Sequence, residues 1–179
     1  LEFINKVPSF GKSFICIDNQ INNEIIREIK TKNFYTYGIN KNSNFRIKNV
    51  RQHKKLSIFN INISLPAKQK AILKDINIPL LGLHNIRNAT AAAAVAFTIG
   101  ISKKIIKESL NKFEGVQRRF NKIFSYRGVN FFDDYAHHPT EIKELIEGVK
   151  KVYQKEEIFC VFQPHRISRL KDLRKEFSL

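Results

Sequence analysis

Methionine is absent from all 179 residues, and cysteine occurs only twice, at Cys16 and Cys160. Without a methionine at position 1, Leu1 is not expected to be a natural start, which suggests a piece of a longer chain. The cysteines stand far apart, each inside an apolar run (14–17 and 158–162). That setting is typical of buried strand residues and not of a disulfide framework or a metal site. We therefore expect a reducing, cytoplasmic compartment.

Long hydrophobic runs are also missing. No basic stretch followed by an apolar one opens the chain. The most apolar helix candidate, residues 89–101, is interrupted by Thr90, Thr98 and Gly100 and is too short to span a bilayer. With 42% hydrophobic residues, the chain can bury the core of one domain or of parts of two. A soluble protein with no membrane partner is expected.

Acidic residues are scarce, since 16 Asp and Glu stand against 32 Lys and Arg, a formal net charge of +16. Such an excess can attract nucleic acid. Here it is spread along the chain without a basic block interleaved with aromatics, and the abundant Lys, Asn, Ile and Phe are residues that AT-rich codons specify. We expect no nucleic-acid partner and keep a basic RNA-binding module as an alternative.

The first part of the chain combines a β-α-β unit with a meander. Apolar runs bounded by polar residues predict strands at 12–17 and 34–37, separated by an amphipathic helix that ends near Lys30. Strict alternation of apolar and polar residues predicts a half-buried strand at 59–65, with 46–50 as its antiparallel partner.

Two helices follow, an Ala-rich one opening at 82–89 and one at 101–113 capped by Ser102. The helical period then breaks, and we place a domain boundary between residues 114 and 115, so that 1–114 and 115–179 belong to different domains. The next predictions are a hairpin of 120–126 and 129–132 turning at Arg127-Gly128, a helix from Pro139 to about Tyr153, and a buried strand at 158–162. Strand, helix, strand argues for a parallel α/β sheet with Gln163–Arg169 at a strand's carboxyl end, where such folds bind ligands.

Two polar clusters flank the predicted boundary. Asn85 and Asn88 are three residues apart in the first turn of the Ala-rich helix, so both amides can face the edge of a flat heterocycle. A simple helix cap explains Asn85 equally well. Arg118 and Arg119 are adjacent and can clamp a phosphate, although a solvated surface pair, taken alone, explains them better.

Two more clusters lie further along the chain. Residues 133–141 gather carboxylates, a phenol and two imidazoles between a strand end and a helix start. Adjacent histidines point in different directions, so we favour one that contacts a ligand and one held structurally over a two-His metal site. Arg166 and Arg169 can share a helix face and grip a carboxylate or phosphate. All four clusters together favour an enzyme that handles phosphates and carboxylates.

The four clusters resemble motifs of the Mur ligase family. The matching strings are 82–89, 115–120, 133–141 and 162–169, and Leu1–Pro8 also resembles a segment of the family. They occur in the right order and extend over essentially the whole chain. The resemblance implies an α/β fold, namely the end of a central P-loop-type ATPase domain, up to about Glu114, followed by the start of a Rossmann-like C-terminal domain.

The strings are most similar to family members that attach L-alanine to UDP-N-acetylmuramate with ATP and Mg²⁺, through an acyl phosphate, in peptidoglycan synthesis. This resemblance implies that Asn85 and Asn88 contact adenine, Arg119 the γ-phosphate region and Asp134 the ribose. It further implies that Tyr135, His137, Arg166 and Arg169 form the L-alanine pocket, with His165 beside them as a further substrate-binding residue. Arg119 and His137 are the catalytic candidates.

A Gly-x-x-x-x-Gly-Lys-Ser/Thr phosphate loop is missing, because Gly11-Lys12-Ser13 lacks the earlier glycine. We expect the Mg²⁺ ligands outside this chain, the remainder of the same enzyme as a partner, and no ligation by the 179-residue chain alone. The alternative within the family is the recycling ligase that attaches a preformed tripeptide to the same nucleotide sugar.

Overall fold

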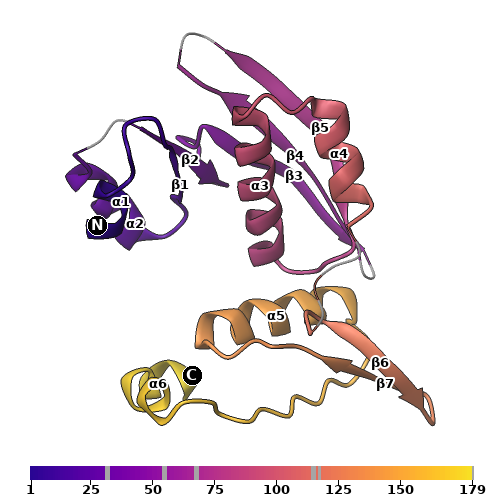
Figure 1. Ribbon diagram of the computed structural model, residues 1–179. Coiled ribbons are helices and arrows are strands. Elements are labelled where there is room, and N and C mark those ends of the chain that lie inside the picture. The colour runs from indigo at the N-terminus through magenta and orange to yellow at the C-terminus, as the bar shows by residue number, and fades with distance from the viewer. Residues whose placement is uncertain (31–32, 54–55, 67–68, 114–115, 117, 179) are drawn as a thin grey trace.

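The computed structural model describes residues 1–30, 33–53, 56–66, 69–113, 116 and 118–178. Figure 1 shows two lobes, which we call the N-terminal lobe (residues 1–113) and the C-terminal lobe (residues 118–178). The predicted boundary between residues 114 and 115 lies outside the described residues. None of the described helices is both long and apolar enough to cross a membrane.

The N-terminal lobe is built on a five-stranded sheet in the order β1-β2-β3-β4-β5. The strands are β1 (Ser13–Cys16), β2 (Phe34–Gly38), β3 (Phe45–His53), β4 (Leu56–Ser64) and β5 (Lys70–Ile78). The helices are α1 (Glu2–Asn5), α2 (Gln20–Glu28), α3 (Leu83–Thr98) and α4 (Lys103–Asn111). Strands β1 to β3 pair in parallel, whereas β3, β4 and β5 pair antiparallel. The predicted β-α-β unit, the meander and both later helices are confirmed.

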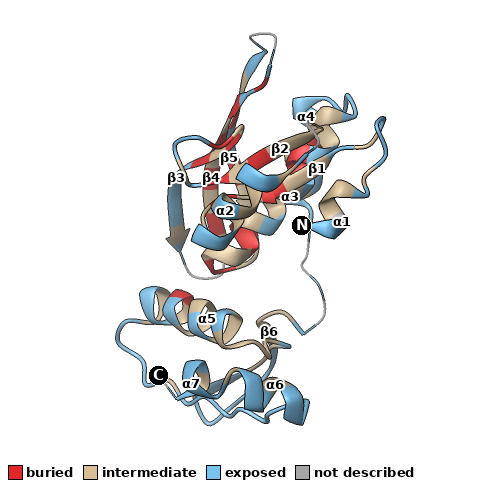
Figure 2. Ribbon diagram, turned by 90° about the vertical axis from the view of Figure 1, so that its left-hand side faces the viewer, coloured by how far each residue is buried: buried red, intermediate tan, exposed pale blue. Residues whose placement is uncertain are grey.

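The core lies between this sheet and the helices α3 and α4, which cover one of its faces (Figure 1). Alternate residues of β4 point inward, and Phe59 and Ile61 are fully buried. Ile86 of α3 and Ile106 of α4 pack in the same cluster. Buried residues concentrate in this lobe, and α5 of the C-terminal lobe contains only one (Figure 2). The N-terminal lobe therefore supplies most of the apolar stabilisation.

Strand β5 has no counterpart among the predictions, because a β-bulge breaks its alternation. Leu73 and Ile76 are both buried, although they are three positions apart and regular alternation would require two or four. Lys74 and Asp75 together lie opposite Asn60 of β4, since Leu73 pairs with Ile61 and Ile76 with Phe59. Asp75 has a φ of 50°. This extra residue returns Ile76 to the inner face of the sheet.

Asn44 joins β2 to β4 at the place where the pairing of β2 with β3 ends. Its Oδ1 accepts hydrogen bonds from the backbone N–H of Thr36 (2.9 Å) and from the Thr36 hydroxyl (3.0 Å). Its Nδ2 donates to the carbonyl oxygen of Ser64 (3.0 Å). One side chain thus satisfies backbone groups that no neighbouring strand reaches.

The C-terminal lobe contains a two-stranded antiparallel sheet and three helices. The elements are β6 (Asn121–Tyr126), β7 (Val129–Asp133), α5 (Pro139–Val152), α6 (Ile167–Asp172) and α7 (Arg174–Phe177). Arg127 and Gly128 have positive φ angles of 47° and 81°, as a two-residue hairpin turn requires. The predicted hairpin and the helix beginning at Pro139 are confirmed.

The predicted buried strand at 158–162 is wrong. These residues belong to no strand, and Phe159 and Val161 are 81% and 98% exposed. An apolar run becomes a buried strand only beside paired strands and under covering helices, and the only sheet described in this lobe is the antiparallel pair β6-β7. The predicted parallel sheet of this lobe is therefore also wrong, and Gln163–Arg169 leads into α6 instead of following a strand. Cys160 is exposed, contrary to expectation, while Cys16 is half-buried in β1.

Candidate functional site

The loop between β7 and α5 is held in place by Asp134. Its Oδ2 accepts the backbone N–H of Phe120 (2.8 Å), and its Oδ1 accepts that of Ala136 (2.7 Å). Each carboxylate oxygen has two lone pairs, so both retain one for a further donor. Asp134 thus fixes the local backbone and can still accept hydrogen bonds from a hydroxyl-bearing ligand.

Arg118 packs against the same loop. Its Nε donates to Asp133 Oδ2 (3.1 Å), its guanidinium lies 4.8 Å from the ring centre of Tyr135, and its carbonyl oxygen accepts the N–H of Tyr135 (2.7 Å). The solvated pair that sequence favoured for the two arginines is therefore only half right, because Arg118 has a structural role.

Arg119 differs from its neighbour. It is half-buried, and its side chain forms no ion pair with the residues that the structure describes. It stands between Arg118 (φ 60°) and Phe120 (φ 51°), two residues in the left-handed region that L side chains rarely adopt. Such backbone strain is often found at functional positions, and the role of Arg119 at a phosphate stays a prediction.

The two histidines of the loop have different roles. His138 is the N-cap of α5, and its Nδ1 accepts the N–H of Thr140 (3.3 Å). His137 lies edge-on to Tyr135, with ring centres 5.2 Å apart, and its backbone N–H donates to Glu141 (3.2 Å). Within the described part of the chain, no three His, Cys, Asp or Glu side chains gather as a metal site would require. His138 is therefore the structural histidine, and His137 is the one beside an exposed ring.

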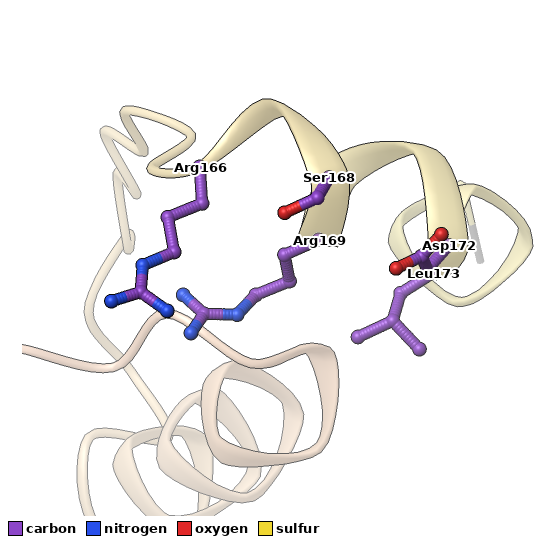
Figure 3. A pocket seen from close by; sticks show the side chains of 5 residues that line it. All are labelled: Arg166, Ser168, Arg169, Asp172 and Leu173. Atoms are coloured by element: carbon purple, nitrogen blue, oxygen red, sulfur yellow. The ribbon is translucent and has the colours of Figure 1, made fainter.

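Arg166 and Arg169 line one open pocket of about 300 Å³, together with Ser168, Asp172 and Leu173. Figure 3 shows both guanidinium groups extending to the same side of α6. Arg166 is the N-cap of this helix and has a φ of 67°. The predicted sharing of a helix face is confirmed. Tyr135, His137 and the exposed His165 do not line this pocket, so the predicted five-residue L-alanine site is not assembled as one cavity.

Asn85 and Asn88 lie in the first two turns of α3 and have different environments. Asn85 is buried, and its Nδ2 donates to the carbonyl oxygen of Leu81 (2.7 Å). The N-cap of α3 is Gly82, so the alternative that Asn85 is a simple cap is wrong. Asn88 is exposed. The role of both amides at an adenine ring stays a prediction.

The N-terminal part of α3 touches the C-terminal lobe. Arg87 Nη1 lies 2.9 Å from Glu144 Oε1 on α5. The helix that carries the two asparagines therefore contacts the helix that follows the Asp134 loop. Sequence reasoning missed both charged residues, because a contact between positions 57 apart leaves no local pattern.

Family comparisons agree with this architecture. The family "Mur ligase middle domain" matches residues 1–96, and "Mur ligase, glutamate ligase domain" matches residues 118–178. The chain belongs to the Mur ligase family.

Two relatives are similar over the whole chain. The UDP-N-acetylmuramate--L-alanine ligase of Pelagibacter ubique (strain HTCC1062) is 62% identical over 179 residues, which are 100% of this chain and 39% of the relative. The ligase of the same name from Brachyspira hyodysenteriae is 38% identical, over 99% of this chain and 37% of its own length. The chain thus spans about two fifths of the length of these curated relatives.

Solved structures share the fold. MurF from Acinetobacter baumannii superposes with a TM-score of 0.68 at 20% identity, covering 87% of this chain and 32% of that one. The UDP-N-acetylmuramate-alanine ligase MurC from Thermotoga maritima gives 0.60 at 24% identity, covering 88% and 40%. At these identities the likeness describes the fold alone.

Proposed function

We propose that the chain is part of an ATP-dependent ligase that joins L-alanine to UDP-N-acetylmuramate through an acyl phosphate in peptidoglycan synthesis. The observation that carries the proposal is the 62% identity, across all 179 residues, to a relative named for this reaction. The proposal favours single-amino-acid ligation over tripeptide recycling. A murein peptide ligase from Psychrobacter arcticus shares the fold, at 26% identity and a TM-score of 0.59.

The described side chains fit a nucleotide. Arg119 offers to the γ-phosphate region a half-buried guanidinium that forms no ion pair with the described residues, and Asp134 keeps lone pairs for ribose hydroxyls. The exposed amide of Asn88 is free to meet the adenine edge, with Asn85 behind it in the same turn. ATP supplies the phosphoryl group that activates the acid. Mg²⁺ is expected to take its ligands from outside this chain.

Substrate positioning falls to the C-terminal lobe. Arg166 and Arg169 present two guanidinium groups to one open pocket, a geometry suited to a carboxylate. Holding L-alanine by its carboxylate leaves its amine free to attack the activated acid. Tyr135, His137 and His165 are proposed to complete the site when substrates are bound. His137, beside the exposed ring of Tyr135, is the proposed contact to the amino acid.

A chimera tests the proposal. This chain replaces the matching segment of the Pelagibacter ubique relative, and ADP release is measured with UDP-N-acetylmuramate and L-alanine. We expect L-alanine-dependent turnover in the chimera and none from the 179-residue chain alone. Arg119→Ala should lower kcat roughly 100-fold or more. Arg127→Ala, at the far hairpin turn, is the matched control and should leave turnover unchanged.

Specific results would contradict the proposed function or favour one of the alternatives. A folded chimera that lacks turnover, beside an active parent relative, would overturn the proposal. Preference for a tripeptide over L-alanine would favour the recycling ligase. Filter binding to RNA across a salt series tests the remaining alternative, because a basic RNA-binding module must show a steep loss of affinity with salt.

A further inference from the structure

Asp18, which follows β1, anchors a chain of charged contacts. Its Oδ1 accepts the backbone N–H groups of Ile39 (2.8 Å) and Asn40 (3.0 Å), and its Oδ2 accepts Arg87 Nε (2.8 Å). The Asp18 side chain is only 8% exposed. Because two backbone donors already hold this carboxylate, it fixes the guanidinium of Arg87 in one orientation.

Arg87 also contacts the C-terminal lobe, through Glu144 of α5. Its Nη1 lies 2.9 Å from Glu144 Oε1, and the two side chains are 23% and 24% exposed. His84, one turn before, places Nδ1 3.4 Å from Glu144 Oε2. His84 Nδ1 and Glu144 Oε2 are both buried, and neither has a well-aligned hydrogen-bond partner among the described residues. Each is therefore the nearby polar atom that the other can interact with. Contact with His84, opposed by burial and reinforced by Arg87, lowers the pKa of Glu144.

Two glycines let the lobes approach closely beside these charges. A Cβ on Gly148 of α5 would lie 3.3 Å from both the Cα and the N of Gly82, the N-cap of α3. Gly148 is also the one buried residue in α5. The hydrogen bonds and ion pairs described between α3 and α5 are made by titratable side chains, Arg87 and His84 with Glu144. Interfaces of this kind between domains open more readily than apolar ones.

We propose that Glu144 is a positioning residue, which docks α5 on the N-terminal part of α3 through the inter-lobe bridge formed by Asp18, Arg87 and Glu144. The bridge sets the position of the C-terminal lobe, with Arg119 and Asp134, relative to the start of α3, which carries Asn85 and Asn88. The effect of the bridge on ATP binding rests on the proposed function, in which residues of both lobes contact the same nucleotide. The effect of the bridge on the distance between the lobes does not depend on that function and applies to the 179-residue chain alone.

Inter-lobe distances measured by spin labelling test the bridge in the 179-residue chain. One label sits on the exposed native Cys160, and the other on Lys104→Cys of α4, whose side chain is 84% exposed, in a Cys16→Ser background. We expect one narrow distance distribution, broadened and lengthened by Glu144→Gln. Glu147→Gln, an exposed residue of the same helix, is the matched control and should change nothing.

The dependence of the distance distribution on salt concentration is a second measurement of the bridge. Raising NaCl from about 0.05 M to about 1 M shortens the screening length and should broaden the distribution of the labelled parent, with a smaller effect in Glu144→Gln. Far-UV circular dichroism checks that every variant folds. An unchanged distribution in Glu144→Gln, or equal salt responses in the two proteins, would overturn the proposal.

The chimera adds a functional readout. Glu144→Gln should raise the KM for ATP roughly 5-fold or more while changing kcat less, and Glu144→Asp should restore part of the loss. Equal KM values for ATP in Glu144→Gln and in the parent would show that the bridge does not affect ATP binding. If the parent chimera is inactive, the proposed function fails, and the distance measurement still decides the positioning role.

Discussion

The carboxylate of Asp134 accepts the backbone N–H of Phe120 at 2.8 Å, which ties the start of β6 to the end of β7. Asp134→Ala removes this bond and the one from Ala136. Hydrogen bonds to charged groups contribute about 1.5 to 3 kcal/mol, so we expect the free energy of unfolding to fall by about that amount. Urea unfolding followed by circular dichroism measures it.

The neighbouring Asp133→Ala is the control for that substitution. Asp133 pairs with Arg118 on an exposed surface, and such pairs contribute about 0 to 1 kcal/mol. If both alanine variants lose the same stability, the backbone role of Asp134 is wrong.

Asn44→Ala tests the junction between β2 and β4. The substitution leaves the backbone N–H of Thr36 and the carbonyl of Ser64 without their side-chain partner. We expect a loss of about 1 to 3 kcal/mol, measured by chemical denaturation. Asn42→Ala, at an exposed position of the same loop, should stay within about 0.5 kcal/mol of the parent. Equal losses in both variants would contradict the role given to Asn44.

The two thiols should react at different rates. Burial raises the pKa of Cys16, which leaves less thiolate at a given pH, and its side chain is half-buried. Cys160 is exposed. At about pH 8 we expect a maleimide to modify Cys160 at least roughly 10-fold faster, as read by mass spectrometry of peptides. Comparable rates would mean that residues 158–162 are covered in solution.

Acid should weaken the contact between the lobes. The pKa of Glu144 is lowered in the folded protein below its ordinary value of 4.5, so its charge stabilises the folded state above that pH. The stabilisation is lost as the pH falls through the lowered value. Glu144→Gln should therefore lose less stability than the parent between about pH 5 and about pH 3, whereas Glu147→Gln should follow the parent. Parallel curves for all three proteins would exclude this contribution.

Local sequence patterns predicted most of the helices and strands, but few of the contacts between distant parts of the chain. Alternation identified β4, and Ser102 and Pro139 identified two helix starts, because each signal lies within a few residues. Residues 158–162 have the same apolar composition as a buried strand, and only the lack of a pairing strand makes them exposed. Strand pairing depends on distant parts of the chain, so composition alone cannot reveal it.

Sequence patterns likewise predicted some features of the candidate site and missed others. Sequence placed Asp134 and the Arg166–Arg169 pair correctly at a strand end and on one helix face, since spacing alone determines those positions. It did not separate Arg118, which packs on Tyr135, from Arg119, which stays free of ion pairs in the described chain. Identical side chains in adjacent positions differ only through tertiary contacts. The roles at adenine, ribose and L-alanine stay predictions.

The bulge in β5 has a consequence for evolution and engineering. Lys74 and Asp75 share one place opposite Asn60, so the strand is one residue longer than its partner needs. Deleting either residue would remove the bulge and leave one residue opposite Asn60, so that Leu73, Ile76 and Ile78 stay on the inner face by regular alternation. The bulge should therefore tolerate the loss of one residue, whereas a one-residue deletion in the regular stretch that follows it would exchange the two faces of the strand.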